Sequence, residues 1–143
     1  MADSKTALNS KAGYAENIEE MTLNNENFRE VLYTGEKLQL VLMTLKPGEE
    51  IGEEVHDDKD QFFRFESGTG EVHINKVVNP VEDGMAVIVP AGSLHNVVNT
   101  GDDNLTMYTV YAGPDHKDAT VHKTKDQAER DHDNDEYDGK PTE

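Results

Sequence analysis

Short runs of alternating apolar and polar residues fill the middle of the chain, between Phe28 and Tyr111, and turn-forming residues separate them. Alternation over four to eight residues is typical of half-buried β-strands, and nothing in this region has the 3.6-residue period of an amphipathic helix. The sequence therefore predicts an all-β barrel or sandwich rather than alternating strands and helices. The expected strands are Phe28 to Tyr33, Leu38 to Leu45, Glu53 to His56, Gln61 to Glu66, Glu71 to Val78, Met85 to Val89, His95 to Asn99 and Leu105 to Tyr111.

The segment before the strands is polar. Residues 1–27 carry one short apolar pattern, Ile18, Met21 and Leu23, which predicts one turn of helix or a strand laid over the domain. At 143 residues the chain has the length of one domain. We therefore expect a single barrel over residues 28–113, with an N-terminal polar segment before it.

The segment after the strands is acidic. Residues 114–143 contain little apolar sequence, and they predict a C-terminal extension that is solvated and partly disordered. Within it, Lys125 to Arg130 is expected to form a short helical turn. Two histidines near the start of the extension, His116 and His122, are expected to cover a barrel end or a subunit contact.

The charge of the chain restricts its partners. Thirty Asp and Glu against thirteen Lys and Arg give a net charge of -17, which repels nucleic-acid phosphates and anionic lipid head groups. We therefore expect no nucleic acid and no membrane as partner. The sequence contains no cysteine, which excludes disulfides, thiol catalysis and thiolate metal sites. Since neither a secretory signal nor an apolar run of 18 residues is visible, a cytoplasmic location is expected.

Four polar residues are predicted on the inner face of the barrel, because residues two apart on a strand share a face. Imidazole, carboxylate and amide donors of this kind suit a divalent transition metal. The alternative is that the acidic run from Glu49 to Asp60 is simply an exposed loop at the barrel mouth. Such an acidic rim would attract metal cations and disfavour anionic substrates. The four residues are Glu54, His56, Gln61 and His95.

The spacing of these residues resembles the two motifs of the cupin family. The first motif has Gly, five residues, His, one residue, His, three or four residues, Glu, six residues and Gly. At those positions this chain has Gly48, Glu54, His56, Gln61 and Gly68. The second motif has Gly, five residues, Pro, one residue, Gly, two residues, His, three residues and Asn. It is matched throughout, by Gly84, Pro90, Gly92, His95 and Asn99.

The resemblance to small single-barrel cupins implies a jelly-roll, or double-stranded β-helix, and a metal site within it. The chain departs from the motif twice, since Glu54 stands at the first His and Gln61 at the Glu. We expect Glu54, His56 and His95 as metal ligands. Gln61 is expected either as a weak fourth ligand or as a residue that orients bound water or substrate. The donors are compatible with Fe, Mn, Ni, Co, Zn or Cu, and the sequence does not distinguish among these metals.

A substrate pocket beside the metal is also expected. Arg64 faces away from Gln61 by alternation, and no Lys or Arg is predicted inside the barrel, which weakens any assignment to phosphorylated sugars. His73 is expected to face outward. For Phe63, Phe65 and Tyr111 the alternative is that the aromatic side chains simply pack in the hydrophobic core. The residues expected to line the pocket are Phe63, Phe65, Asn99 and Tyr111.

The resemblance leaves the reaction open, because cupins share a fold far more than a chemistry. We expect a metal-binding cupin that acts on a small organic molecule, with a metal-dependent oxygenase as one form of this function. One alternative is an enzyme like the phosphosugar isomerases that act on mannose 6-phosphate, and another is a non-catalytic cupin that binds or stores a small ligand. No catalytic residue can be named from the sequence. A homodimer is expected from the habit of the family.

Overall fold

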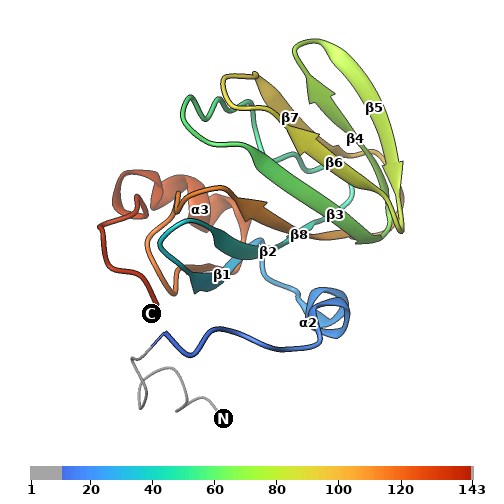
Figure 1. The fold of residues 1–143 in the computed structure, drawn as a ribbon. Helices are drawn as coiled ribbons and strands as arrows, with labels where there is room; N and C mark the ends of the chain where they lie inside the picture. Colours follow the sequence, from blue (N-terminus) through green and yellow to red (C-terminus); the bar gives the residue numbers. More distant parts are fainter. Residues whose placement is uncertain (1–10, 143) are drawn as a thin grey trace.

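The computed structural model describes residues 11–142, and its centre is a barrel of two antiparallel sheets (Figure 1). The larger sheet has six strands in the order β6-β3-β8-β2-β1-β9, and the smaller has three in the order β5-β4-β7. The all-β jelly-roll prediction is confirmed. The strands are β1 (Arg29–Thr34), β2 (Gln39–Leu45), β3 (Gln61–Ser67), β4 (Thr69–Ile74), β5 (Val77–Glu82), β6 (Ala86–Val89), β7 (His95–Asn99), β8 (Leu105–Tyr111) and β9 (Val121–His122).

Two of the predicted strands differ in the structure. The expected run from Glu71 to Val78 is a hairpin, in which β4 and β5 reverse at Asn75 and Lys76 with φ of 48° and 73°. Two successive positive φ values make a tight turn whose twist suits a hairpin, and only Asn75 signals it in the sequence. The expected strand Glu53 to His56 is a loop that forms one isolated β-bridge.

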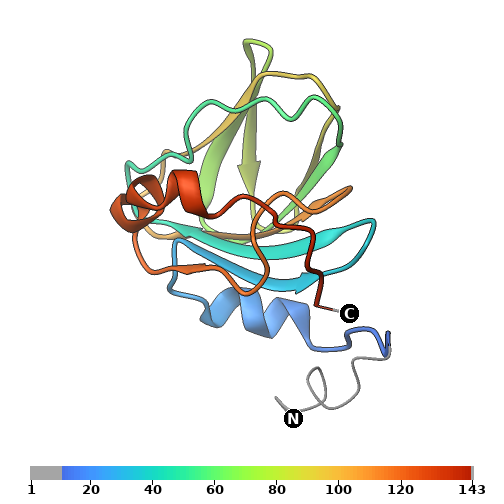
Figure 2. The same ribbon diagram turned by 90° about the vertical axis from the view of Figure 1, so that its left-hand side faces the viewer.

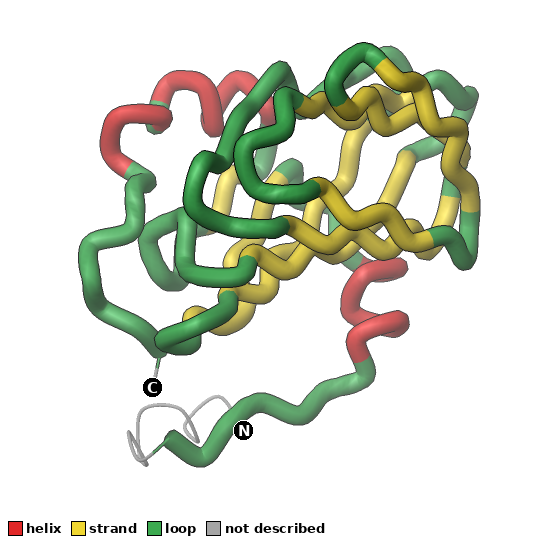
Figure 3. Tube along the Cα trace, turned by 45° about the horizontal axis from the view of Figure 1, so that its top comes forward, coloured by secondary structure: helices red, strands yellow, loops and turns green. Residues whose placement is uncertain are grey.

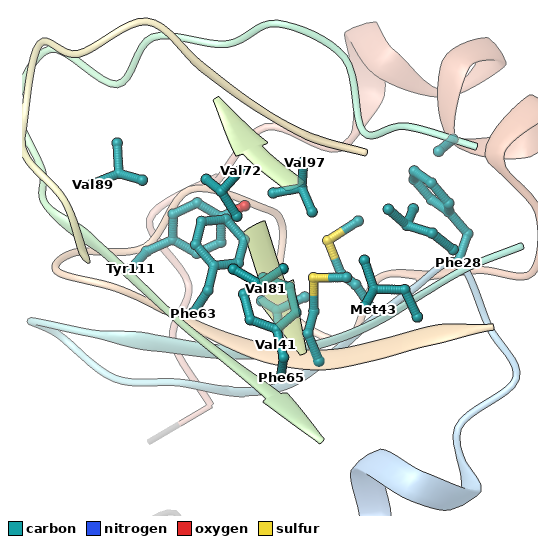
Figure 4. Close-up of a cluster of buried hydrophobic side chains, with 14 of the residues drawn as sticks. Phe28, Val41, Met43, Phe63, Phe65, Val72, Val81, Val89, Val97 and Tyr111 are labelled. Carbon is teal, nitrogen blue, oxygen red and sulfur yellow. The ribbon is translucent and has the colours of Figure 1, made fainter. Parts of the chain in front are cut away.

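The hydrophobic core lies between the two sheets, as Figure 4 shows. Alternation along β3 points Phe63 and Phe65 inward, where they are 1% and 0% exposed. From the smaller sheet, Val72 and Val97 meet them in the same buried cluster. Side chains therefore fill this part of the barrel.

The glycines of the motif serve the turns between strands. Gly68 has a φ of +89°, and a Cβ atom built on it would lie 2.4 Å from the carbonyl oxygen of Asn104. Only glycine combines that backbone conformation with such a close approach. Gly92 has a φ of +84°, and its N–H donates to the carbonyl of His56 at 2.9 Å. Gly92, in the second motif, is thus hydrogen-bonded to His56, in the first motif.

The N-terminal apolar pattern forms a helix, α2 (Ile18–Asn24), rather than a strand. Asn17 caps it, and its side-chain oxygen accepts the N–H of Glu20 at 3.0 Å. The helix packs on the outside of the larger sheet, against β3 and β8 (Figure 2). No helix among residues 11–142 is long and apolar enough to cross a membrane.

Over the described residues 114–142, the C-terminal extension contains regular structure and is buried at four residues, His116, His122, Ala128 and Asp135. Beyond β9 it forms α3 (Lys125–Arg130), as predicted, and a 3-10 turn, η1 (His132–Asn134). It crowds one end of the barrel together with several loops (Figure 3). Ala128 joins the core, and Asp135 is 8% exposed. Two polar pairs, His116 with Asp135 and His122 with Asp131, lie within the extension.

One glutamine holds the start of the extension against the barrel. The side chain of Gln39 on β2 is fully buried. Its Nε2 donates to the carbonyl of His116 at 2.7 Å, and its Oε1 accepts the N–H groups of Asp115 and His116 at 3.1 and 2.9 Å. These bonds satisfy main-chain groups that would otherwise be buried without partners, so the position of Asp115 is closely fixed.

Candidate metal centre

Glu54, His56 and His95 converge near the end of the barrel. One ligand atom from each lies within 4.8 Å of the others, and this is the group of three that emerges from the described part of the chain. Glu54 and His56 come from the loop between β2 and β3, whereas His95 begins β7. The structure therefore brings together the three residues expected as firm ligands.

Main-chain hydrogen bonds, rather than a regular strand, align the loop with β7. The N–H of Glu54 donates to the carbonyl of His95, and the N–H of His95 donates to that of Glu54, each at 2.9 Å. Nearby, the N–H of Ile51 donates to the carbonyl of Val97 at 2.9 Å. The loop thus runs antiparallel to β7 and delivers its side chains beside His95.

Both histidines turn a buried Nε2 atom toward the cluster. The Nδ1–H of His95 donates to the carbonyl of Ser93 at 3.0 Å, so that a lone pair is left on Nε2. The Nε2 atoms of His56 and His95 are buried and neither has a hydrogen-bond partner, although that of His56 lies 3.5 Å from a carboxylate oxygen of Glu54. Buried, orphaned imidazole nitrogens beside a carboxylate are what a transition-metal site requires, so these residues fit a divalent ion.

The charges around His56 favour a cation. Burial alone would lower the pKa of His56, but the carboxylates of Asp115 and Glu54, 3.4 and 3.5 Å from its ring nitrogens, raise it to about 9. Burial would raise the pKa of Glu54, yet His56 beside it keeps that pKa below its ordinary value. The negative charges that stabilise the protonated imidazole would also stabilise a metal ion that replaced the proton.

Gln61 is the first residue of β3 and is 2% exposed. Its Nε2 donates to the hydroxyl of Thr109 at 2.9 Å, whereas its Oε1 is buried without a partner. The amide oxygen is therefore the atom of Gln61 left available to a ligand or metal.

Two of the expected pocket residues lie against the cluster. The ring of Tyr111 meets that of His56 edge to face, with centroids 5.4 Å apart, and Phe63 lies 6.5 Å from the ring of His95. Phe65 stacks on Phe63 at 6.2 Å and is fully buried, so it belongs to the core behind this layer. Figure 4 labels Phe63 and Tyr111 within the buried cluster.

Asn99 lies at the opposite end of β7 from His95 and is not brought to the cluster. Its amide donates to the carbonyls of Leu45 and Asp103 at 2.9 Å, and its oxygen accepts the N–H of Gly101 at 2.9 Å. Expecting this residue in the pocket was wrong, because its polar atoms are used to tie loops together.

Sequence reasoning missed Asp115 and Arg29. Asp115 follows β8, and no local pattern connects it with His56. Arg29, in contrast, shares an alternation face with the core residue Val31, a signal that could have revealed it. Both residues line a cavity of about 450 Å³ between Glu54 and His56 on one side and the C-terminal extension on the other.

A chain of polar contacts runs from the cluster into the extension. The Tyr111 hydroxyl lies 3.2 Å from Nε2 of His116, and Nδ1 of His116 lies 3.3 Å from Asp135. Burial, followed by the charges of Glu54 and Asp115, raises the pKa of Tyr111 well above its ordinary value, so the phenol stays neutral. His116 thus covers the barrel end, one of the two positions expected from the sequence.

The family follows from a match of the cupin domain model to residues 41–111, the segment that carries both motifs. The chain belongs to the cupin family. Its structure superposes on the crystal structure of BH2720 from Bacillus halodurans with a TM-score of 0.82 and 41% identity, covering 85% of this chain and 96% of that one.

Two further relatives extend the comparison. The uncharacterized protein YrkC of Bacillus subtilis is 46% identical over 119 residues, which is 78% of this chain and 63% of YrkC. This chain thus spans less than two thirds of YrkC. The uncharacterized protein L612 of Acanthamoeba polyphaga mimivirus is 37% identical over 119 residues, which is 80% of this chain and 74% of L612.

Proposed function

We propose that this cupin binds a divalent transition metal through Glu54, His56 and His95 and acts there on a small organic molecule. The observation that carries the proposal is the pair of buried, unpartnered Nε2 atoms of the two histidines beside a carboxylate, all within 4.8 Å. An adjacent cavity of about 450 Å³ is large enough for a small ligand.

The residues around the cluster have distinct tasks in this proposal. Asp115 holds the ring of His56 in place, much as carboxylates orient ligating histidines elsewhere. Phe63 and Tyr111 exclude water from one side. When bound, a divalent ion supplies Lewis-acid polarisation of a ligand oxygen, and iron adds the ability to activate dioxygen. His116 contacts Asp135 through Nδ1 and the Tyr111 hydroxyl through Nε2, and so links Tyr111 to the extension.

The phosphosugar alternative conflicts with the charge of the cavity. A phosphate dianion calls for two or more cationic side chains. The lining includes one arginine, whereas Glu54, Asp115 and Asp135 each have a pKa below its ordinary value and are ionised at neutral pH. An oxygenase or a binding protein for a less highly charged molecule suits this environment better.

Metal binding is tested by isothermal titration of the metal-free protein with Zn²⁺, Fe²⁺ and Mn²⁺, together with elemental analysis of the purified protein. One metal ion per chain is expected for the wild type, and none after His56→Ala with His95→Ala. His73→Ala is the matched control, since His73 faces outward on β4 and pairs with Glu71 at 2.9 Å. Full metal content in the double variant would refute the proposal.

Catalysis is distinguished from storage by turnover. Dioxygen uptake by the iron-loaded protein is measured with a panel of small organic acids, alcohols and phenols. Substrate-dependent uptake that disappears in the double variant supports an oxygenase. Tight binding without turnover, in every metal form, supports the non-catalytic alternative.

A homodimer remains a proposal as well. On the edge strand β6, Ile88 is 64% exposed, and Phe62 lies opposite it on β3. An apolar edge of this kind is usually covered in solution. Light scattering is expected to give twice the chain mass for the wild type and a lower mass after Ile88→Asp.

A further inference from the structure

Arg29 is a buried cation beside the proposed metal centre. It is the first residue of β1, and its side chain is 8% exposed. It lines the same cavity as Glu54 and His56. Arginine is rarely buried unless its guanidinium group is paired with hydrogen-bond acceptors or an anion.

The guanidinium group is incompletely satisfied. Its Nη1 lies 3.3 Å from Nδ1 of His122 and 3.8 Å from a carboxylate oxygen of Asp135, and the latter distance is too long for a hydrogen bond. Its Nε is buried without any partner. A guanidinium group has five N–H donors in a planar fork, and the one on Nε is left free.

The charges that line the cavity balance when a divalent metal is bound. Three carboxylates and one arginine of the lining have side chains no more than a third exposed. With a divalent metal bound and His56 neutral, these groups sum to zero charge, so the guanidinium group is the cation of the lining that an anion can approach. The acidic rim counts for less, because Glu53 and Glu136 are exposed and screened by water. The four groups of the lining are Glu54, Asp115, Asp135 and Arg29.

We propose that Arg29 binds the carboxylate of a small monocarboxylic acid, whose remaining atoms occupy the cavity toward Glu54 and His56. The inference rests on the proposed metal-binding function and names its substrate class. Two parallel N–H bonds to a carboxylate would satisfy the free Nε of Arg29.

The test follows the arginine Nε–H signals of the Zn²⁺-loaded protein by ¹⁵N NMR. The chain contains only three arginines, Arg29, Arg64 and Arg130, so each signal can be assigned by substitution. The loaded protein is titrated with acetate, propionate and butyrate, and with the amides of the same length as uncharged controls. The Arg29 signal is expected to shift and saturate with the acids but not with the amides, while the other two stay in place.

Substitution gives the second readout. Arg29→Gln is expected to weaken carboxylate binding at least tenfold at unchanged Zn²⁺ stoichiometry, whereas Arg64→Gln, on the outer face of β3, leaves it unchanged. If the Arg29→Gln variant does not fold, the shift of the Arg29 Nε–H signal in the wild-type protein still tests the inference. A stationary Arg29 signal, or carboxylate binding that survives Arg29→Gln, would overturn this inference alone. Zn²⁺ is titrated first, and failure of that step would overturn the proposed function and this inference together.

Discussion

Glu54 and His95 exchange both of their main-chain hydrogen bonds, so two proposed ligands from distant parts of the sequence are aligned by backbone atoms. The side chains play no part in this bridge. Substitution of either residue is therefore expected to remove a donor without displacing the loop from β7. Variants of the site can thus be compared at constant fold, which makes metal affinity an informative measurement.

Asp115→Asn is expected to weaken metal binding roughly 10- to 100-fold, because the amide no longer holds the ring of His56 as the carboxylate does at 3.4 Å. Isothermal titration with Zn²⁺ measures the change. Asp57→Asn removes the same charge from an exposed position of the neighbouring loop and serves as the control. Equal affinities in the two variants would show that Asp115 acts only through its charge at a distance.

Gln61→Leu is expected to lower metal affinity roughly tenfold if the free amide oxygen is a fourth donor. The metal-free protein should lose little stability, because Thr109 keeps its own bond to the carbonyl of Phe62 at 2.8 Å. Zn²⁺ titration and thermal unfolding without metal separate the two effects. Unchanged affinity would remove Gln61 from the donor set.

Asp135→Asn is expected to alter the acid stability of the protein. Burial would raise the pKa of Asp135, but His116 and Arg29 lower it below the usual 3.8. Its ionised form therefore contributes stability that is complete above about pH 4 and is lost as the pH falls through the lowered pKa. Urea unfolding should show Asp135→Asn less stable by on the order of 1–3 kcal/mol at pH 7, with the difference shrinking by pH 2.

Asp133→Asn is the control for this measurement, because its side chain is fully exposed. It should follow the wild type at every pH. A constant deficit for Asp135→Asn between pH 7 and pH 2 would contradict the assignment of the low pKa to that residue.

Gly68→Ala is expected to destabilise the barrel by on the order of 2–4 kcal/mol, since its Cβ would lie 2.4 Å from the carbonyl oxygen of Asn104. Gly84→Ala has a similar φ of +91° but no atom within 4 Å of the new Cβ. It should cost only about 1 kcal/mol, the strain of the backbone alone. Thermal unfolding of the two variants distinguishes the clash from the strain, and equal losses would refute the role of the close approach.

The candidate ligands were predictable because their evidence was local. Glu54, His56 and His95 stand at fixed distances from the turn residues of the motif, and turns set where a strand begins. Even so, the reason first given for Glu54 and His56 was wrong, since they lie on a loop rather than on a strand. Asn99 matched its motif equally well, yet its side chain hydrogen-bonds to loop residues. The spacing of a motif predicts where a residue lies but not what its side chain contacts.

By itself, the sequence determined an all-β barrel and three of its candidate ligands, because alternation and turn chemistry act over a few neighbouring residues. Only the tertiary structure decided that the acidic extension folds over the barrel end, with Asp115 against His56 and Arg29 in the cavity. Those contacts join segments far apart in the chain. A polar residue is buried when partners are present to satisfy it, and composition cannot reveal partners that only folding brings near.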